Sequence, residues 1–251
     1  MVEELLARIE DAGLNASAPP QQRVLDGWLL RFSPGKAKRA RCVNAIGAGR
    51  LALAPKLALC EQVYADAGLP MIVRVTPFSE PAGLDAALDA AGLARFDDTR
   101  VMCLPTLDAL AEPVAPSPRA VSGDEFAWAV GALRGTSAGQ CEAHAQRLRL
   151  SPVAHRGFVL ERDGRVAACG QFALEGALAG VYDVFTAANA RRQGLASALC
   201  LHLLRCARDL GARTAYLQVD ADNLAARTVY AALGFADVYA YHYRARAETP
   251  S

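Results

Sequence analysis

Two arginines, a glutamine and a glycine stand together in "RRQGLAS", residues 191–197, where a strand-like run gives way to an apolar-periodic segment. The first N–H groups of a helix have no partner inside the helix and carry partial positive charge, so a helix start here could bind phosphate. Gly194 would let an anion approach the backbone without a Cβ in the way. Arg191 and Arg192 would add guanidinium groups that suit phosphate oxygens. An exposed, solvated basic turn explains these residues equally well.

A tyrosine and an asparagine lie further along, in "NLAARTVYAALGF", residues 223–235. Asn223 stands where the cap of a helix is expected. Tyr230 shares one helical face with Ala226 and Leu233, so the spacing alone favours packing of its ring in the core. Its phenol, with an ordinary pKa of about 10, could also donate a proton to a leaving group.

The strand before residues 191–197 contains an acidic residue between apolar neighbours. Asp183 lies in "VYDVF", where a carboxylate is unusual unless it faces a polar cleft. Gln171 and Gln218 lie in neighbouring predicted strands and could orient a substrate, although hydrogen bonding at strand edges explains them slightly better. Glu175 ends a predicted strand and fits a turn. Asp183 is therefore the candidate for a general base.

Composition limits the class of protein. The chain has 251 residues, a formal net charge of +1 and 53% hydrophobic residues, which predicts a packed core in one large or two ordinary domains. Near-neutral charge gives no footprint for nucleic acid or an anionic membrane, and "GKAKRAR" (35–41) fits a solvated strand end. Seven scattered cysteines and four histidines lack metal-ligand spacing. We expect a cytoplasmic protein with reduced thiols and no metal.

Periodicity and turn residues predict an alternation of helices and strands. Helices are expected at 2–12 (ended by Gly13), 56–69, 84–92, 122–133, 142–150, 194–212 and 224–235. Strands are expected in 21–49, at 70–78 and 100–107, in a hairpin at 157–174 that turns at Asp163-Gly164, and at 178–187, 214–220 and 237–246. The proline-rich stretch 108–121 has no periodicity and is interpreted as a linker.

The order helix, strand, helix, strand occurs in both halves of the chain, and each second helix ends in glycine followed by an apolar residue. This similarity predicts a duplicated domain. We expect one domain at 1–107, a linker at 108–117 and a second domain at 118–251.

Both polar motifs resemble signatures of the GNAT superfamily of N-acetyltransferases. The first signature, [RQ]-x-x-G-x-[GA], corresponds to Arg191-Arg192-Gln193-Gly194-Leu195-Ala196. The second, N-x-x-A-x-x-x-Y-x-x-x-G-F, corresponds to Asn223, Ala226, Tyr230, Gly234 and Phe235. The resemblance covers residues 118–246. The N-terminal half has Leu88 in place of Tyr230 and lacks the first signature before 56–69, so the chain resembles tandem GNAT proteins with one degenerate half.

The resemblance implies an α/β fold of the GNAT type: two similar domains, each a mixed, mostly antiparallel twisted sheet flanked by helices. It implies transfer of an acetyl group from acetyl-CoA to a primary amine, with a small-molecule acceptor favoured and the protein a monomer or homodimer. A non-catalytic acyl-CoA sensor, another acyl donor and a hydroxyl acceptor remain alternatives.

By the same resemblance, each site residue has an expected role. The backbone of Val184, Phe185 and Thr186 would hold the pantetheine and polarise the thioester carbonyl. The amides of Arg192, Gln193, Gly194, Leu195, Ala196 and Ser197 would bind the pyrophosphate. Tyr230 would protonate the departing thiolate, and Asn223 and Ala226 would border the pantetheine arm, with helix capping an equal alternative for Asn223.

Overall fold

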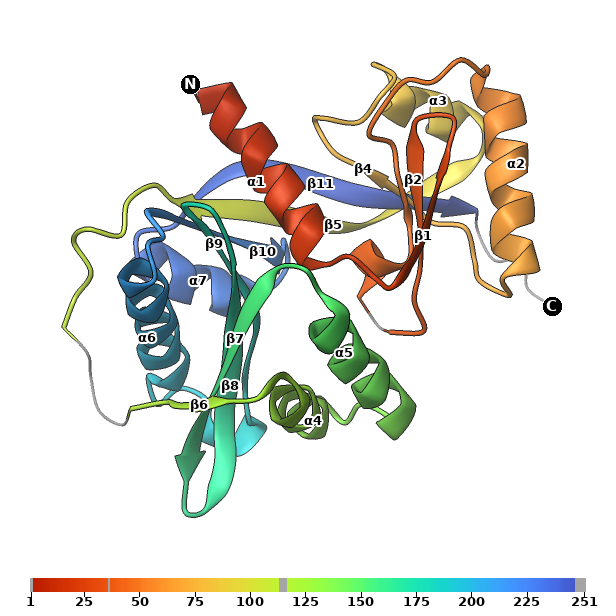
Figure 1. The fold of residues 1–251 in the computed structure, drawn as a ribbon. Coiled ribbons are helices and arrows are strands. Elements are labelled where there is room, and N and C mark those ends of the chain that lie inside the picture. Colours follow the sequence, from red (N-terminus) through yellow and green to blue (C-terminus); the bar gives the residue numbers. More distant parts are fainter. Residues whose placement is uncertain (1, 36, 113–116, 247–251) are drawn as a thin grey trace. The chain divides into compact units, whose positions relative to one another are not determined.

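The computed structural model describes residues 2–35, 37–112 and 117–246 (Figure 1). The chain forms two compact units. The large unit contains the residues up to Ala16 together with Val101–Val238, and the small unit contains Ser17–Arg100 together with the residues from Tyr239 onward. The chain therefore passes between units after Ala16, Arg100 and Val238. The expected domains at 1–107 and 118–251 are consecutive segments, whereas each unit is built from two separate segments of the chain.

The large unit is built on a mixed, mostly antiparallel sheet. Its strands follow the order β10, β9, β8, β7 and β6, with β10 parallel to β9 and the other pairs antiparallel. Their bounds are β6 (Arg119–Val121), β7 (Ala154–Arg162), β8 (Arg165–Glu175), β9 (Leu178–Thr186) and β10 (Thr214–Asp220). The helices are α1 (Val2–Ala16), α4 (Gly123–Arg134), α5 (Ala138–Leu150), α6 (Leu195–Asp209) and α7 (Leu224–Ala232), with a 3₁₀ turn at η2 (Ala188–Ala190).

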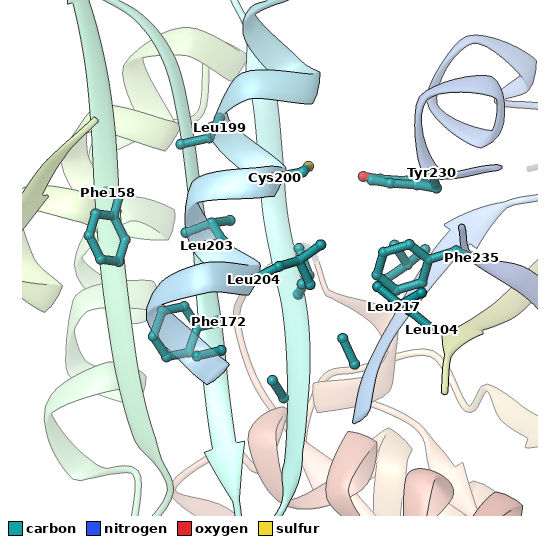
Figure 2. Close-up of a cluster of buried hydrophobic side chains, with 14 of the residues drawn as sticks. Leu104, Phe158, Phe172, Leu199, Cys200, Leu203, Leu204, Leu217, Tyr230 and Phe235 are labelled. Atoms are coloured by element: carbon teal, nitrogen blue, oxygen red, sulfur yellow. The ribbon is translucent and has the colours of Figure 1, made fainter. Parts of the chain in front are cut away.

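Helices pack on both faces of this sheet. Phe172 of β8 lies in one core cluster with Leu199 and Leu203 of α6 (Figure 2). Cys169, an odd number of residues away on the same strand, packs with Phe126 of α4 in another cluster. Successive side chains of a strand point to opposite faces, so α6 and α4 cover opposite faces of the sheet. The predicted hairpin is confirmed, because β7 and β8 join through Asp163 and Gly164, both with positive φ.

Two sequence predictions in this unit were wrong. Helix α1 does not end at Gly13 but continues to Ala16. A Cβ on Gly13 would lie 2.6 Å from Nε2 of Gln218, so this glycine allows α1 to pack closely on β10. The expected linker also extended too far, since Arg119–Val121 form β6 and pair with β7. Residues 113–116 of that linker lie outside the described residues.

The small unit has its own sheet and core. Strands β1 (Gln21–Leu25), β2 (Trp28–Phe32), β3 (Val43–Asn44) and β4 (Val73–Val75) are followed by β11 (Ala236–Arg246) and β5 (Leu93–Leu104), the two long strands that continue from one unit into the other. Helices α2 (Leu53–Asp66) and α3 (Leu84–Ala90) accompany them, with a 3₁₀ turn at η1 (Lys38–Ala40). Leu88 is fully buried in this core, beside Trp28 and Tyr64. The order α2, β4, α3, β5 matches α6, β10, α7, β11, and duplication stays a prediction.

Among the described helices, none combines the length and apolar character that crossing a bilayer requires.

Candidate active site

A β-bulge shapes the strand that leads into the basic loop. Tyr182 of β9 pairs with Gln171 of β8 and Phe185 pairs with Cys169, so Asp183 and Val184 together face one residue of β8. Asp183 has a φ of 53°, unusual for a residue with a side chain. Because a bulge changes the alternation of a strand, the side chain of Asp183 is directed to the face with α4 and α5.

Strands β9 and β10 pair over only part of their length. The register of described pairs joins Leu178–Val181 to Thr214–Leu217, whereas β9 continues to Thr186 and β10 to Asp220. The predicted cofactor residues Val184, Phe185 and Thr186 lie in the part of β9 beyond these pairs, where β9 pairs with β8 on one side and its edge toward β10 is unpaired. Backbone groups along an unpaired strand edge can bind an extended, amide-containing ligand.

The start of α6 has the geometry of an anion site. Gly194, the N-cap, has a φ of 74°, and Arg192 has a φ of 59°. Within 4 Å of a Cβ placed on Gly194 there is no described atom, so the backbone is accessible there. Among the described residues, none accepts a hydrogen bond from the amides of residues 192–197. Arg191 and Arg192 are exposed and make no ion pair with a described residue. A phosphate group would complement this loop.

Side chains hold the loop in place. A guanidinium N–H of Arg162 on β7 donates a hydrogen bond to Oε1 of Gln193, whose Nε2 donates to the carbonyl of Asn189 (3.4 Å). Arg191 Nε donates to the carbonyl of Thr186 (3.5 Å). Leu195 is buried in the core against which α6 packs. Ala196 and Ser197 are half-buried in the first turn.

Tyr230 presents a hydroxyl group that has no hydrogen-bond partner in the described part of the chain. The residue is 9% exposed, and its ring packs edge-on against Phe235 with centroids 6.1 Å apart. Figure 2 shows the hydroxyl directed toward Cys200 of α6, and it makes no hydrogen bond with any described residue. Burial raises the pKa of Tyr230, so the phenol keeps its proton at neutral pH. It is therefore able to donate that proton to a ligand atom.

Asn223 caps α7. Its Oδ1 accepts a hydrogen bond from the backbone N–H of Ala226 at 3.2 Å, and the residue is exposed. This contact is the capping role that the sequence suggested. Ala226 lies against the core beside Tyr230.

Asp183 is held by surrounding polar groups. Its Oδ1 accepts from Arg134 at 2.9 Å, and its Oδ2 accepts from Gln171 at 2.7 Å. Burial by itself would raise the pKa of Asp183, but Arg134, His144 and Arg147 together with the Gln171 hydrogen bond hold this pKa well below its ordinary value. The carboxylate is therefore ionised and committed to neighbours, which makes it a weak base.

Two polar residues that sequence reasoning did not connect with the site meet at Asp183. Arg134 ends α4 just before the left-handed Gly135 cap, and His144 lies in the middle of α5. Both fit a solvated helix surface when only the sequence is read. The signal that could have drawn attention to them is a pair of polar residues on two helices that precede a predicted strand with an acidic residue between apolar neighbours. Among the described residues, no cluster of His, Cys, Asp and Glu could hold a metal ion.

Comparisons with known proteins agree with this geometry. Residues 127–235 match the model of the acetyltransferase (GNAT) family. An uncharacterized N-acetyltransferase, YobR, from Bacillus subtilis (strain 168) is 26% identical over 235 residues, covering 89% of this chain and 91% of the relative.

Two solved structures share the fold. A GCN5-related N-acetyltransferase from Kribbella flavida has a TM-score of 0.71 at 19% identity, covering 97% of this chain and 96% of that one. A tandem GNAT protein from the clavulanic acid biosynthesis pathway has a TM-score of 0.62 at 18% identity, covering 95% and 88% of the two chains. The chain has the mixed α/β GNAT fold, and within it residues 127–235 are similar to the GNAT acetyltransferase family.

Proposed function

We propose that the protein is an acetyl-CoA-dependent N-acetyltransferase that transfers an acetyl group to the primary amine of a small molecule. The observation that carries this proposal is the protonated Tyr230 hydroxyl, which lacks a hydrogen-bond partner among the described residues although its ring packs in the core beside Phe235. Its proton is therefore available to a ligand atom placed beside it. The family match supplies the ligand class.

The chain offers one group for each requirement of the reaction. The first turn of α6, with Arg191 and Arg192, would bind the pyrophosphate of the cofactor. The unpaired edge of β9 would bind the pantetheine and direct backbone N–H groups at the thioester carbonyl, where negative charge develops during transfer. Tyr230 would give its proton to the sulfur as the C–S bond breaks and recover one from solvent.

Thiol release provides the test of this function. Purified protein is mixed with acetyl-CoA and with putrescine, tyramine, lysine or kanamycin, which represent four classes of primary amine. Amine-dependent release of CoA above the rate without amine is expected for at least one class. Binding of acetyl-CoA without release of CoA for any amine would favour the acyl-CoA sensor. Release of CoA from propionyl-CoA or acetoacetyl-CoA but not from acetyl-CoA would show that the acyl donor is a different one.

A further inference from the structure

A polar cluster lies on the face of the large-unit sheet that carries α4 and α5. It consists of Asp183 on β9, Gln171 on β8, Arg134 on α4, and His144 and Arg147 on α5. The cluster directly precedes Val184, Phe185 and Thr186, the strand segment to which the proposed function assigns the thioester. Asp183 therefore adjoins, along β9, the backbone that is proposed to hold the thioester.

His144 differs from the other members because it can accept a proton. Its Nε2 is enclosed and lies 3.6 Å from Oδ2 of Asp183, and its ring meets Phe126 edge-on with centroids 6.2 Å apart. A carboxylate at this position favours the tautomer with hydrogen on Nε2. The lone pair is then on Nδ1, which makes no hydrogen bond with a described residue.

The geometry points to His144 as the general base: we propose that its Nδ1 takes the proton from the acceptor amine, while Asp183 positions the imidazole. This inference rests on the proposed function. The nitrogen of the ammonium group loses two protons. The first passes to the imidazole and then to solvent, the nitrogen forms a bond to the acetyl carbon, and the C–S bond breaks as Tyr230 protonates the sulfur. The second passes from the nitrogen to solvent, from which Tyr230 recovers its proton.

The charge state of His144 agrees with this role. Burial lowers the pKa of His144, and the neighbouring cations Arg147 on its own helix and Arg134 on α4 lower it further, whereas Asp183 on β9 opposes them. His155 on β7 belongs to the same surroundings. The imidazole is therefore neutral near pH 7 and able to accept a proton. The amine need not lose its proton to bulk solvent first.

Gln171 adds an independent observation. The residue is 1% exposed, its Nε2 donates to Asp183, and its Oε1 has no hydrogen-bond partner among the described residues. Buried amide oxygens are rarely left unpaired in native proteins. The free Oε1 of Gln171 lies beside the Asp183–His144 pair. A substrate that donates an N–H or O–H group could complete its hydrogen bonding.

The test compares His144→Ala with wild type and with His155→Gln, using whichever amine releases CoA. His155 is a matched control, because it is also a half-buried histidine but its Nε2 lies 3.2 Å from the Ser151 hydroxyl. His144→Ala is expected to lower kcat/KM for the amine by about 10²–10⁴-fold at pH 7. The affinity for acetyl-CoA should stay within about twofold, and added imidazole should restore part of the rate. His155→Gln should change kcat/KM by less than about threefold, without imidazole rescue.

The pH profile separates a base from a structural residue. In wild type, kcat/KM should fall below the pKa of His144 as pH decreases. In His144→Ala this decrease should be absent. Instead, kcat/KM should rise with pH up to the pKa of the amine substrate. An unchanged rate, or a lowered rate with the wild-type pH profile, would overturn the role of His144 while leaving the acetyltransferase intact. Wild-type protein that binds acetyl-CoA but releases no CoA would overturn the proposed function itself.

Discussion

The hydroxyl of Tyr230 makes no hydrogen bond with a described residue, so we do not expect it to stabilise the fold. Tyr230→Phe removes one oxygen and leaves the packing against Phe235 in place, so the free energy of unfolding should stay the same or rise slightly. Loss of the proton donor should lower kcat by about 10²–10⁴-fold with little change in KM for acetyl-CoA. Steady-state kinetics and chemical denaturation measure the two effects.

Tyr64 offers a matched control for this change. It is a second buried phenol, but its hydroxyl donates to the carbonyl of Arg31 at 3.0 Å. Tyr64→Phe should therefore lower the free energy of unfolding by about 1–2 kcal/mol and leave kcat unchanged. Full activity in Tyr230→Phe would remove this residue from the mechanism.

The carboxylate of Asp183 links stability to pH. Its folded pKa lies below the ordinary value of about 3.9, so its contribution is fully present above that pH and is lost as pH falls toward the lowered folded pKa. Asp183→Asn should destabilise the protein by about 1–3 kcal/mol at pH 7, because Arg134 loses a charged partner. Urea unfolding at pH 7 and pH 3 should show a smaller difference in acid. A difference that widens in acid would contradict this account.

At the scale of elements, Gly194 at the start of α6 has a left-handed backbone conformation and also lies where the pyrophosphate is proposed to bind. Gly194→Ala should destabilise the protein by about 1–2 kcal/mol, because φ is 74° but the added Cβ meets no described atom. Gly194→Asp adds a negative charge where phosphate is proposed to bind, and it should weaken acetyl-CoA binding at least tenfold beyond the effect of alanine. Calorimetric titration gives both affinities.

Gly68 supplies the control for strain alone. It follows α2 with a φ of 65° and equally open space around a Cβ. Gly68→Ala and Gly68→Asp should cost similar stability without changing acetyl-CoA affinity. Equal affinity for alanine and aspartate at position 194 would argue against an anion site there.

At the scale of the whole molecule, the chain passes between units three times, so neither expected domain is complete alone. A fragment of residues 1–107 lacks the part of β11 with Arg244, whose guanidinium donates to Asp85 at 2.5 Å and to the carbonyl of Leu93 at 2.7 Å. A fragment of residues 118–251 lacks α1 and the buried Met102 and Leu104.

Expressed separately, each fragment should lose the cooperative thermal unfolding that the full chain shows by circular dichroism. A cooperative transition in either isolated fragment would show that the consecutive division describes an independent folding unit.

Local signals were sufficient for much of the fold. The Asp163-Gly164 turn and β10 match their predictions because turn chemistry and apolar runs are encoded in neighbouring residues. Two predictions failed because packing decided them. Gly13 continues α1 since the helix needs close approach to Gln218, and Arg119–Val121 form an edge strand after a proline-rich stretch because β7 offers a partner.

The turn before α6 was predictable from its motif, whereas the polar surroundings of Asp183 were not. The conformations of Arg192 and Gly194 agree with the predicted turn before α6. The bulge at Asp183 depends on register between strands, which residue types do not reveal. It directs that carboxylate to Arg134 and His144, residues that are close only in three dimensions.

A crystal structure of the protein with acetyl-CoA tests the central claim most directly. We predict pyrophosphate oxygens within hydrogen-bond distance of the amides of residues 192–197, pantetheine along Val184–Thr186, and the thioester sulfur beside the Tyr230 hydroxyl. A cofactor bound elsewhere, or with its sulfur far from that hydroxyl, would contradict the account.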